Sequence, residues 1–215
     1  MKTEIKRNFI IALCFLTAFV FWTFAVCHFD VDAVGPEGSQ VGFSMVNRLF
    51  HSITGVHFSL YVITDWLGLI PVAVCLGFAV FGLVQWIKRK DIRKVDRDIL
   101  MLGGFYIAVM AMYILFEYVV INRRPVLING YLEASYPSST TLLVLCVMPS
   151  AMIQLNRRIK CVPLRQAVIG IIAAFTAFMV VGRLISGVHW LSDIIGGVLL
   201  SAGLVMLYRA ACNIR

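Results

Sequence analysis

Charged residues are scarce in this chain of 215 residues. Asp, Glu, Lys and Arg together make up 14% of it, whereas hydrophobic residues make up 60% and the mean hydropathy is +0.90. A soluble domain contains about 25% charged and about 45–50% apolar residues. The composition therefore excludes a soluble protein and indicates an integral membrane protein.

Three features that would indicate other classes of protein are also absent. No two of the six cysteines have CxxC spacing and most lie in apolar runs, so we expect no zinc site and no disulfide framework. We expect no other metal and no cofactor. No Ser/Gly-rich linker or internal repeat divides the chain, which predicts a single domain over residues 1–215. The apolar run 8–28 lacks the small-x-small pattern of a cleaved signal peptide, so we expect it to remain as a membrane span.

Six apolar runs are close to the length of about 20 residues that a helix needs to cross the hydrocarbon core. The fourth is short and contains Pro149, a residue that kinks helices. We therefore predict an all-α integral membrane protein with six transmembrane helices. The predicted spans are 8–28, 64–87, 98–121, 140–156, 166–185 and 193–209.

The distribution of Lys and Arg predicts the orientation of these spans. Of the 19 such residues, 15 lie near the two termini and in the segments 88–98 and 157–165. Because basic residues stay cytoplasmic, both termini are predicted to lie inside. The same placement explains the net charge of +8 without a nucleic-acid partner. The segments predicted to face outward are 29–63, 122–139 and 186–192. Within the first, residues from about 36 to 60 have the pattern of an interfacial amphipathic helix or a re-entrant segment.

The stretch VGRLISGVHWLSDIIGG, residues 181–197, carries three ionisable side chains between two apolar runs. On a continuous helix, Asp193 would share a face with His189 and could fix its tautomer, leaving one ring nitrogen as a nucleophile or base. A bend at SGV would return Arg183 to the same place. Two interpretations stay open: a functional cluster, and an interfacial His–Asp pair with an arginine that snorkels to the lipid headgroups.

A second polar stretch, FEYVVINRRPVLINGYLEASYPSSTTLL, covers residues 116–143. Its serines and threonines open a predicted span, where they either cap the helix or present hydroxyl and N–H groups to an anion. Arg123 and Arg124 lie directly ahead of a proline. They are either a surface feature or half of a phosphate clamp.

Together these stretches resemble the type 2 phosphatidic acid phosphatase superfamily of lipid phosphatases. The pattern of that superfamily is KxxxxxxRP, then PSGH, then SRxxxxxHxxxD. Its order, its shared outer side and its six-span layout fit this chain. The matching residues are Arg124-Pro125 in the first element, Pro137-Ser138 in the second, and Arg183, His189 and Asp193 in the third.

The resemblance implies a role for each matching residue. His189 would attack phosphorus and form a phosphohistidine, with Asp193 orienting the ring. Two arginines, Arg124 and Arg183, would stabilise charge on the equatorial oxygens. The remaining predicted site residues are Ser138 and Ser139, which would bind phosphate, and Arg123, Glu117 and Thr140, which are candidate modulators.

Three positions depart from the family pattern. Glu117 stands in place of the lysine, Thr140 in place of the PSGH histidine, and Gly182 in place of the serine before the arginine. The resemblance implies that the lost histidine protonates the leaving oxygen, which threonine cannot do near neutral pH. We therefore expect the departures to change the mechanism or abolish it.

The missing acid bears on the substrate. A positioned general acid increases the reaction rate by about 10²–10⁴-fold. An alkoxide leaving from a monoester needs such an acid, because the pKa of its alcohol is near that of bulk water, about 15.7. A phosphate monoester leaving from a diphosphate has a second pKa of about 6 and departs without a proton. The sequence thus favours a lipid diphosphate such as undecaprenyl diphosphate.

Several side chains could compensate for the departures. For Glu117 we expect an ion pair with Arg123 or Arg124, or else a plain interfacial glutamate. The other candidates for the lost acid are more simply explained by packing at the interface, and they are His51, His57, Glu133 and Tyr136.

The leading hypothesis is therefore a metal-independent lipid phosphatase of a bacterial inner or plasma membrane, with an extracytoplasmic site. A phosphotransferase that uses the same intermediate, and a degenerate protein that only binds lipid phosphates, remain open. The retained His189–Asp193 pair favours an enzyme, because a binding protein needs the arginines but not an oriented imidazole.

Overall fold

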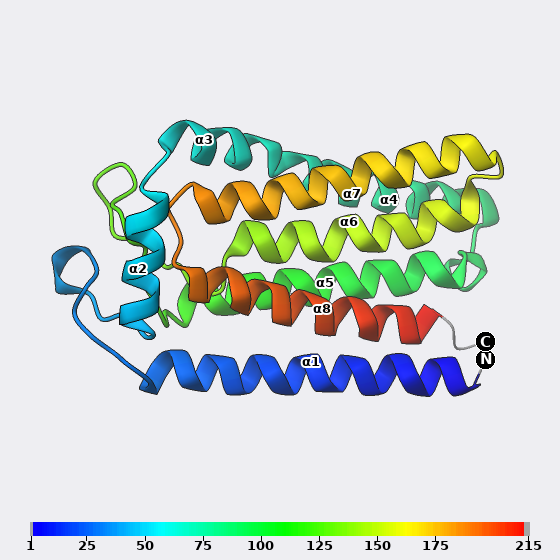
Figure 1. Ribbon diagram of the computed structural model, residues 1–215. Coiled ribbons are helices and arrows are strands. Elements are labelled where there is room, and N and C mark those ends of the chain that lie inside the picture. Colours follow the sequence, from blue (N-terminus) through cyan, green and yellow to red (C-terminus); the bar gives the residue numbers. More distant parts are fainter. Residues whose placement is uncertain (1, 213–215) are drawn as a thin grey trace.

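Helices make up nearly all of the computed structural model, which describes residues 2–212 (Figure 1). Within these residues the only strand-like pairings are isolated bridges. The fold is thus all-α, as predicted. The helices are α1 Lys2–His28, α2 Ser44–Thr54, α3 Phe58–Leu67, α4 Leu69–Arg89, α5 Arg97–Tyr118, α6 Ser139–Arg158, α7 Val162–Ile185 and α8 Leu191–Cys212, with 3₁₀ turns η1 Pro36–Gly38 and η2 Ile92–Lys94.

Six helical segments are long and apolar enough to cross a membrane, as predicted. Five agree with the predicted spans to within a few residues, and α6 continues through Pro149. The second span begins earlier than predicted, because α3 and α4 meet at Gly68 and together form the segment Phe58–Arg89. The connection between the first two spans is correspondingly shorter than the predicted segment 29–63.

Helix α2 lies across one end of the bundle (Figure 1). It exposes Met45, Leu49 and Ile53 on one side and buries Ser44 and Asn47 on the other, which is the pattern of an amphipathic helix. The amide of Asn47 donates to Ser192 Oγ at 2.9 Å and accepts from the Ser192 N–H at 3.1 Å. These two bonds fasten α2 to the first turn of α8.

The core lies where α8 packs between α1 and α6 (Figure 1). Near the end of the bundle where α1 ends, Tyr136 is buried, stacks on Phe19 of α1 and forms a 2.6 Å hydrogen bond with Thr23. The Tyr136 ring fits against α8 only because residue 196 is glycine: a Cβ there would lie 2.5 Å from Tyr136 Cε2. This packing holds the chain that enters α6 directly beside the start of α8.

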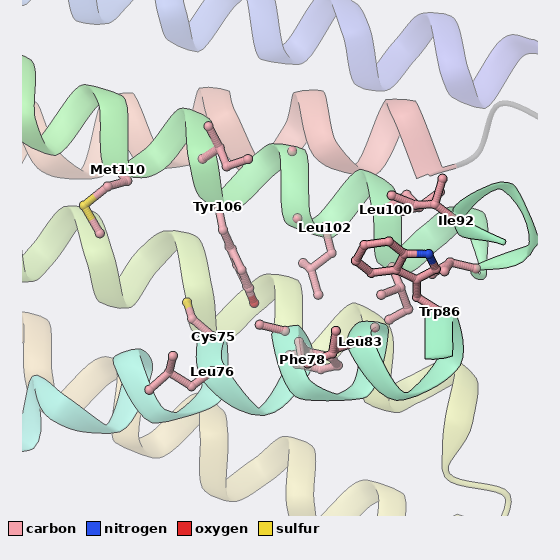
Figure 2. A pocket seen from close by; sticks show the side chains of 17 residues that line it. Cys75, Leu76, Phe78, Leu83, Trp86, Ile92, Leu100, Leu102, Tyr106 and Met110 are labelled. Carbon is pink, nitrogen blue, oxygen red and sulfur yellow. The ribbon is translucent and has the colours of Figure 1, made fainter. Parts of the chain in front are cut away.

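An apolar crevice of about 650 Å³ opens between α4 and α5 (Figure 2). Its labelled lining includes Phe78, Leu83, Trp86 and Met110, with Tyr106 directed into it from α5. None of its lining residues is charged, so it is not the place where the predicted phosphate-binding residues gather.

Candidate functional site

The predicted site residues gather at the end of the bundle opposite the start of α1 and the end of α8 (Figure 1). They come from the end of α5 and the connection 119–138, from the first turn of α6, from the end of α7 and the turn 186–190, and from the first turn of α8. Segments far apart in the sequence thus meet at one end of the bundle.

The turn between α7 and α8 sets the position of His189. Helix α7 ends at Ile185, Gly187 has a φ of 70°, and α8 begins at Leu191. The predicted bend at SGV is therefore present. The alternative of one continuous helix through His189 is wrong, because His189 lies in this turn.

Ser135 links His189 to Asp193. The imidazole Nδ1 lies 4.0 Å from Asp193 Oδ2, which is too long for a direct hydrogen bond. Instead, Ser135 Oγ lies 3.1 Å from Nδ1 and donates a short hydrogen bond to Asp193 Oδ2. The expected direct orientation by the aspartate is thus replaced by a relay through a serine hydroxyl.

This relay fixes the tautomer of His189. The single hydroxyl proton of Ser135 goes to Asp193, so the Ser135 oxygen must accept from an Nδ1–H of the imidazole. Nε2 then carries a lone pair. That atom is buried and has no hydrogen-bond partner anywhere in residues 2–212. A buried, unpaired acceptor of this kind is suited to act as a nucleophile.

The carboxylate at the end of the relay is held from several sides. Asp193 is fully buried, accepts from Asn122 Nδ2 at 3.1 Å and accepts from the Trp190 N–H at 3.0 Å. Asn122 and Ser135 are brought together because the connection folds back on itself, with the Ser135 N–H donating to the Asn122 carbonyl at 2.9 Å. The local fold of one connection thus supplies two of the groups that hold Asp193.

The surroundings of His189 predict its protonation state. Burial lowers the pKa of His189 well below its ordinary value of 6.5, and the charges of Arg124 and Arg183 lower it further. We expect a neutral Nδ1–H imidazole at pH 6.5. The same shift makes folding less favourable as the pH falls below 6.5, since the unfolded chain then binds a proton that the folded chain does not.

Nitrogen-15 NMR of histidine-labelled protein checks this prediction, with the His189 signal assigned by its loss in His189→Ala. A His189 ring that is charged at pH 6.5, or one that carries its single proton on Nε2, contradicts the relay.

Arg183 is buried at the end of α7 and holds groups from two other helices. Its Nη2 donates to Thr140 Oγ1 at 2.6 Å and to Asp65 Oδ1 at 3.1 Å, while its Cζ lies 4.9 Å from the centre of the Tyr61 ring. Nε of Arg183 is buried and has no hydrogen-bond partner among the described residues. It therefore remains available to an anion.

Arg124 approaches the same aromatic ring. Its Cζ lies 5.8 Å from the centre of the Tyr61 ring, and its Nε lies 3.1 Å from Glu133 Oε2. That ion pair is not aligned as a hydrogen bond, and both Nε and Nη1 are buried without a hydrogen-bond partner in residues 2–212. Two arginines with unpaired donors beside an unpaired imidazole nitrogen form an arrangement suited to a phosphate.

The start of α6 adds backbone donors. The first N–H groups of a helix have no partner within it, and here they belong to Ser139, Thr140 and Thr141. Ser138 is fully buried; its N–H donates to the Asp193 carbonyl at 3.1 Å and its hydroxyl accepts from Thr141 at 3.0 Å. These bonds give Ser138 a role in docking α6 on α8, so its role as a phosphate ligand stays a prediction.

The ion pair predicted for Glu117 is wrong. Glu117 is exposed, lines a small hollow with Ser135 and Ser139, and forms no ion pair within residues 2–212. Glu133 is the partner of Arg124, and exposed Arg123 donates to the Leu132 carbonyl at 2.9 Å. The polypeptide folds back near residues 128–131. This brings Glu133, and not Glu117 of α5, into an ion pair with Arg124.

The other candidates for the lost acid are engaged elsewhere. His51 Nε2 lies 3.2 Å from the Gly187 carbonyl, and His57 Nε2 lies 2.9 Å from the Thr54 carbonyl. The Tyr136 hydroxyl bonds to Thr23. Residues 2–212 contain no group of three or more His, Cys, Asp or Glu side chains placed to hold a metal ion.

Sequence reasoning missed four residues of this site: Tyr61, Asp65, Asn122 and Ser135. Asn122 and Ser135 lie in the polar stretch 116–143, where an amide and a hydroxyl could have been considered as hydrogen-bond partners of Asp193. Asp65 lies at the start of the predicted span 64–87, and Tyr61 lies just before it. An aspartate at such a place was the available signal.

Comparisons with known proteins bear on the family and the fold of the chain. The family model of the PAP2 superfamily matches residues 104–213, just over half of the chain. Among solved structures, the chain is similar to "the first transmembrane PAP2 type phosphatidylglycerolphosphate phosphatase from Bacillus subtilis", with 18% identity and a TM-score of 0.55 over 93% of this chain and 94% of that one. No curated protein matches the chain at a significant level. At this identity the likeness concerns the fold.

Proposed function

The chain belongs to the PAP2 superfamily of membrane phosphatases, and from this membership we propose that it is a lipid phosphatase acting through a phosphohistidine at His189. One observation carries the proposal. His189 Nε2 is buried and unpaired, and it lies beside Arg124 and Arg183, which themselves retain unpaired donors. A nucleophile and an anion clamp in one place are what phosphoryl transfer requires.

In the proposed first step, the Nε2 lone pair bonds to phosphorus while the bond from phosphorus to the leaving oxygen breaks and that oxygen takes the electron pair. The Nδ1–H stays hydrogen-bonded to Ser135, and the relay to Asp193 stabilises the positive ring. The donors of Arg124 and Arg183 stabilise the equatorial oxygens. Because the arginines supply the positive charge, the proposed reaction is metal-independent.

The proposed setting is a bacterial inner or plasma membrane. With 15 of the 19 basic residues at the termini and the two predicted inner segments, both termini lie in the cytoplasm and the site lies at the outer face. The chain acts as a single domain with α2 along the outer interface, where its apolar face contacts lipid. The substrate is a lipid phosphate of the outer leaflet.

The environment of Thr140 supports a diphosphate as substrate. Its hydroxyl accepts from Arg183 at 2.6 Å, so this residue positions an arginine and is no general acid. A leaving phosphate monoester, with a second pKa of about 6, needs no such acid. We therefore propose a lipid diphosphate such as undecaprenyl diphosphate.

Phosphate release by the detergent-solubilised protein tests this proposal, with EDTA present and the His189→Ala variant as the blank. We expect release from undecaprenyl diphosphate and a rate lower by about 10²–10⁴-fold from undecaprenyl monophosphate and phosphatidic acid. Equal rates from diphosphate and monoesters would contradict the leaving-group argument.

Two other functions make different predictions in the same assay. A phosphotransferase forms the same labelled intermediate but yields a phosphorylated acceptor in place of inorganic phosphate, so analysis of the products identifies it. A lipid-phosphate binding protein releases nothing, and its affinity for the lipid is the same with and without His189.

A further inference from the structure

A carboxylate that neither the family pattern nor the sequence analysis includes lies at the edge of the site. Asp65, near the end of α3, has a side chain that is 57% exposed, and its Oδ1 lies 3.1 Å from Nη2 of Arg183. The same nitrogen donates to Thr140 at 2.6 Å. Asp65 and Thr140 therefore meet at one atom, with solvent on one side and the first turn of α6 on the other.

Gly182 allows this approach. A Cβ at residue 182 would lie 2.8 Å from Thr64 Cγ2, and Thr64 is fully buried. The absence of a side chain at 182 thus lets α3 pack closely on α7, and the residue after Thr64 then reaches Arg183. Two departures from the family pattern therefore act at the same place: Thr140 removes an imidazole, and Gly182 admits a carboxylate.

The proposed function needs a proton acceptor that the residues described so far do not supply. In its second step a water oxygen bonds to phosphorus while the P–Nε2 bond breaks and Nε2 keeps the bonding pair. The water must lose a proton, and the Thr140 hydroxyl cannot take it near neutral pH. A carboxylate within reach of one water molecule serves as such a base.

We propose that Asp65 is the general base of this second step, an assignment that rests on the proposed phosphohistidine mechanism. The Asp65 carboxylate, placed beside Arg183 by its ion pair, accepts the proton from the attacking water. Because more than half of its side chain is exposed, water reaches it and the proton returns to solvent. Inorganic phosphate and a neutral His189 are the products.

The other carboxylates near the site are less suited to this task. Glu133 pairs with the other arginine, Arg124, and its carbonyl is tied to the Arg124 N–H at 3.1 Å. Asp193 is fully buried and occupied by hydrogen bonds. Glu117 contacts neither arginine as an ion pair within the described chain. Asp65, in contrast, pairs with Arg183, which also donates to Thr140 in the first turn of α6.

The experiment follows the phosphoenzyme formed from undecaprenyl diphosphate labelled on its terminal phosphate. Asp65→Asn keeps the size of the side chain and an oxygen that accepts from Arg183, but it removes the base. We expect full labelling of His189, one equivalent of lipid monophosphate released in a burst, and hydrolysis of the label slowed by about 10²–10⁴-fold. Asp65→Glu is expected to recover part of the hydrolysis rate.

Glu133→Gln is the matched comparison, because it removes the carboxylate from the other arginine. It is expected to change the labelling rate without trapping the label. If Asp65→Asn slows labelling as much as hydrolysis, Asp65 only positions Arg183 and the proposal is overturned. Trapping by Glu133→Gln, or wild-type hydrolysis in Asp65→Asn, overturns it as well. A wild-type protein that neither takes up label nor releases phosphate would overturn the phosphohistidine mechanism itself, and this base with it.

Discussion

His189→Ala is expected to lower phosphate release from the preferred lipid by at least about 10⁴-fold and to abolish covalent labelling. Alanine leaves no lone pair at the position of Nε2, so the two-step reaction has no nucleophile. The arginines proposed to bind phosphate are untouched, so we expect the affinity for lipid phosphate to stay within a few-fold of wild type. Steady-state release and acid-labile labelling, measured on the same preparations, check both statements.

His57→Ala is the control for this variant. His57 is an exposed histidine at the same end of the bundle, and its Nε2 lies 2.9 Å from the Thr54 carbonyl. Its replacement is expected to leave labelling intact. Labelling that persists in His189→Ala and vanishes in His57→Ala would place the nucleophile elsewhere.

Arg183→Lys is expected to reduce kcat/KM by about 10²–10³-fold, although the charge is kept. The guanidinium of Arg183 reaches Asp65, Thr140 and the face of Tyr61 at once. An ammonium has no planar fork with which to bridge these groups and a phosphate together. The loss should appear mainly in kcat, since the developing charge on the equatorial oxygens is greatest in the transition state.

Arg123→Lys is the matched control, because Arg123 is exposed and its guanidinium donates to a backbone carbonyl. We expect a loss below about fivefold, as for other surface contacts. Thermal unfolding of both variants in detergent separates a loss of catalysis from a loss of fold. Equal losses in the two variants would show that this site depends on total charge and not on the position of Arg183.

The arrangement of spans was accessible from the sequence because it depends on local properties. Length and hydropathy determine which segments can cross a membrane, and they found all six. The start of the second span was placed at residue 64 instead of Phe58, because residues up to about 60 were assigned to an interfacial or re-entrant segment. The polar residues near this start, Thr64 and Asp65, are polar for a reason that is not local, since they contact Arg183 in another helix.

The contacts within the site could not be obtained in the same way. The pattern of spacing found His189, Asp193 and both arginines, because residue order is visible in a sequence. Their partners are distant: Ser135 is 54 positions from His189, and Asp65 is 118 positions from Arg183. The length of the relay also depends on the shape of the turn before α8, which placed His189 outside the helix.

The packing of α1 against α8 has a consequence for biogenesis. Helix α1 leaves the ribosome early, yet the helix that covers its buried face, with the Trp22 indole donating to the Ser192 carbonyl at 3.0 Å, is made after six others. Until then that face must be sheltered by lipid or by the insertion machinery. Because His189 lies directly before α8 and Asp193 lies in its first turn, the step that covers α1 also brings together the proposed catalytic groups. A nascent chain is therefore expected to be inactive towards lipid phosphates until α8 has packed against α1.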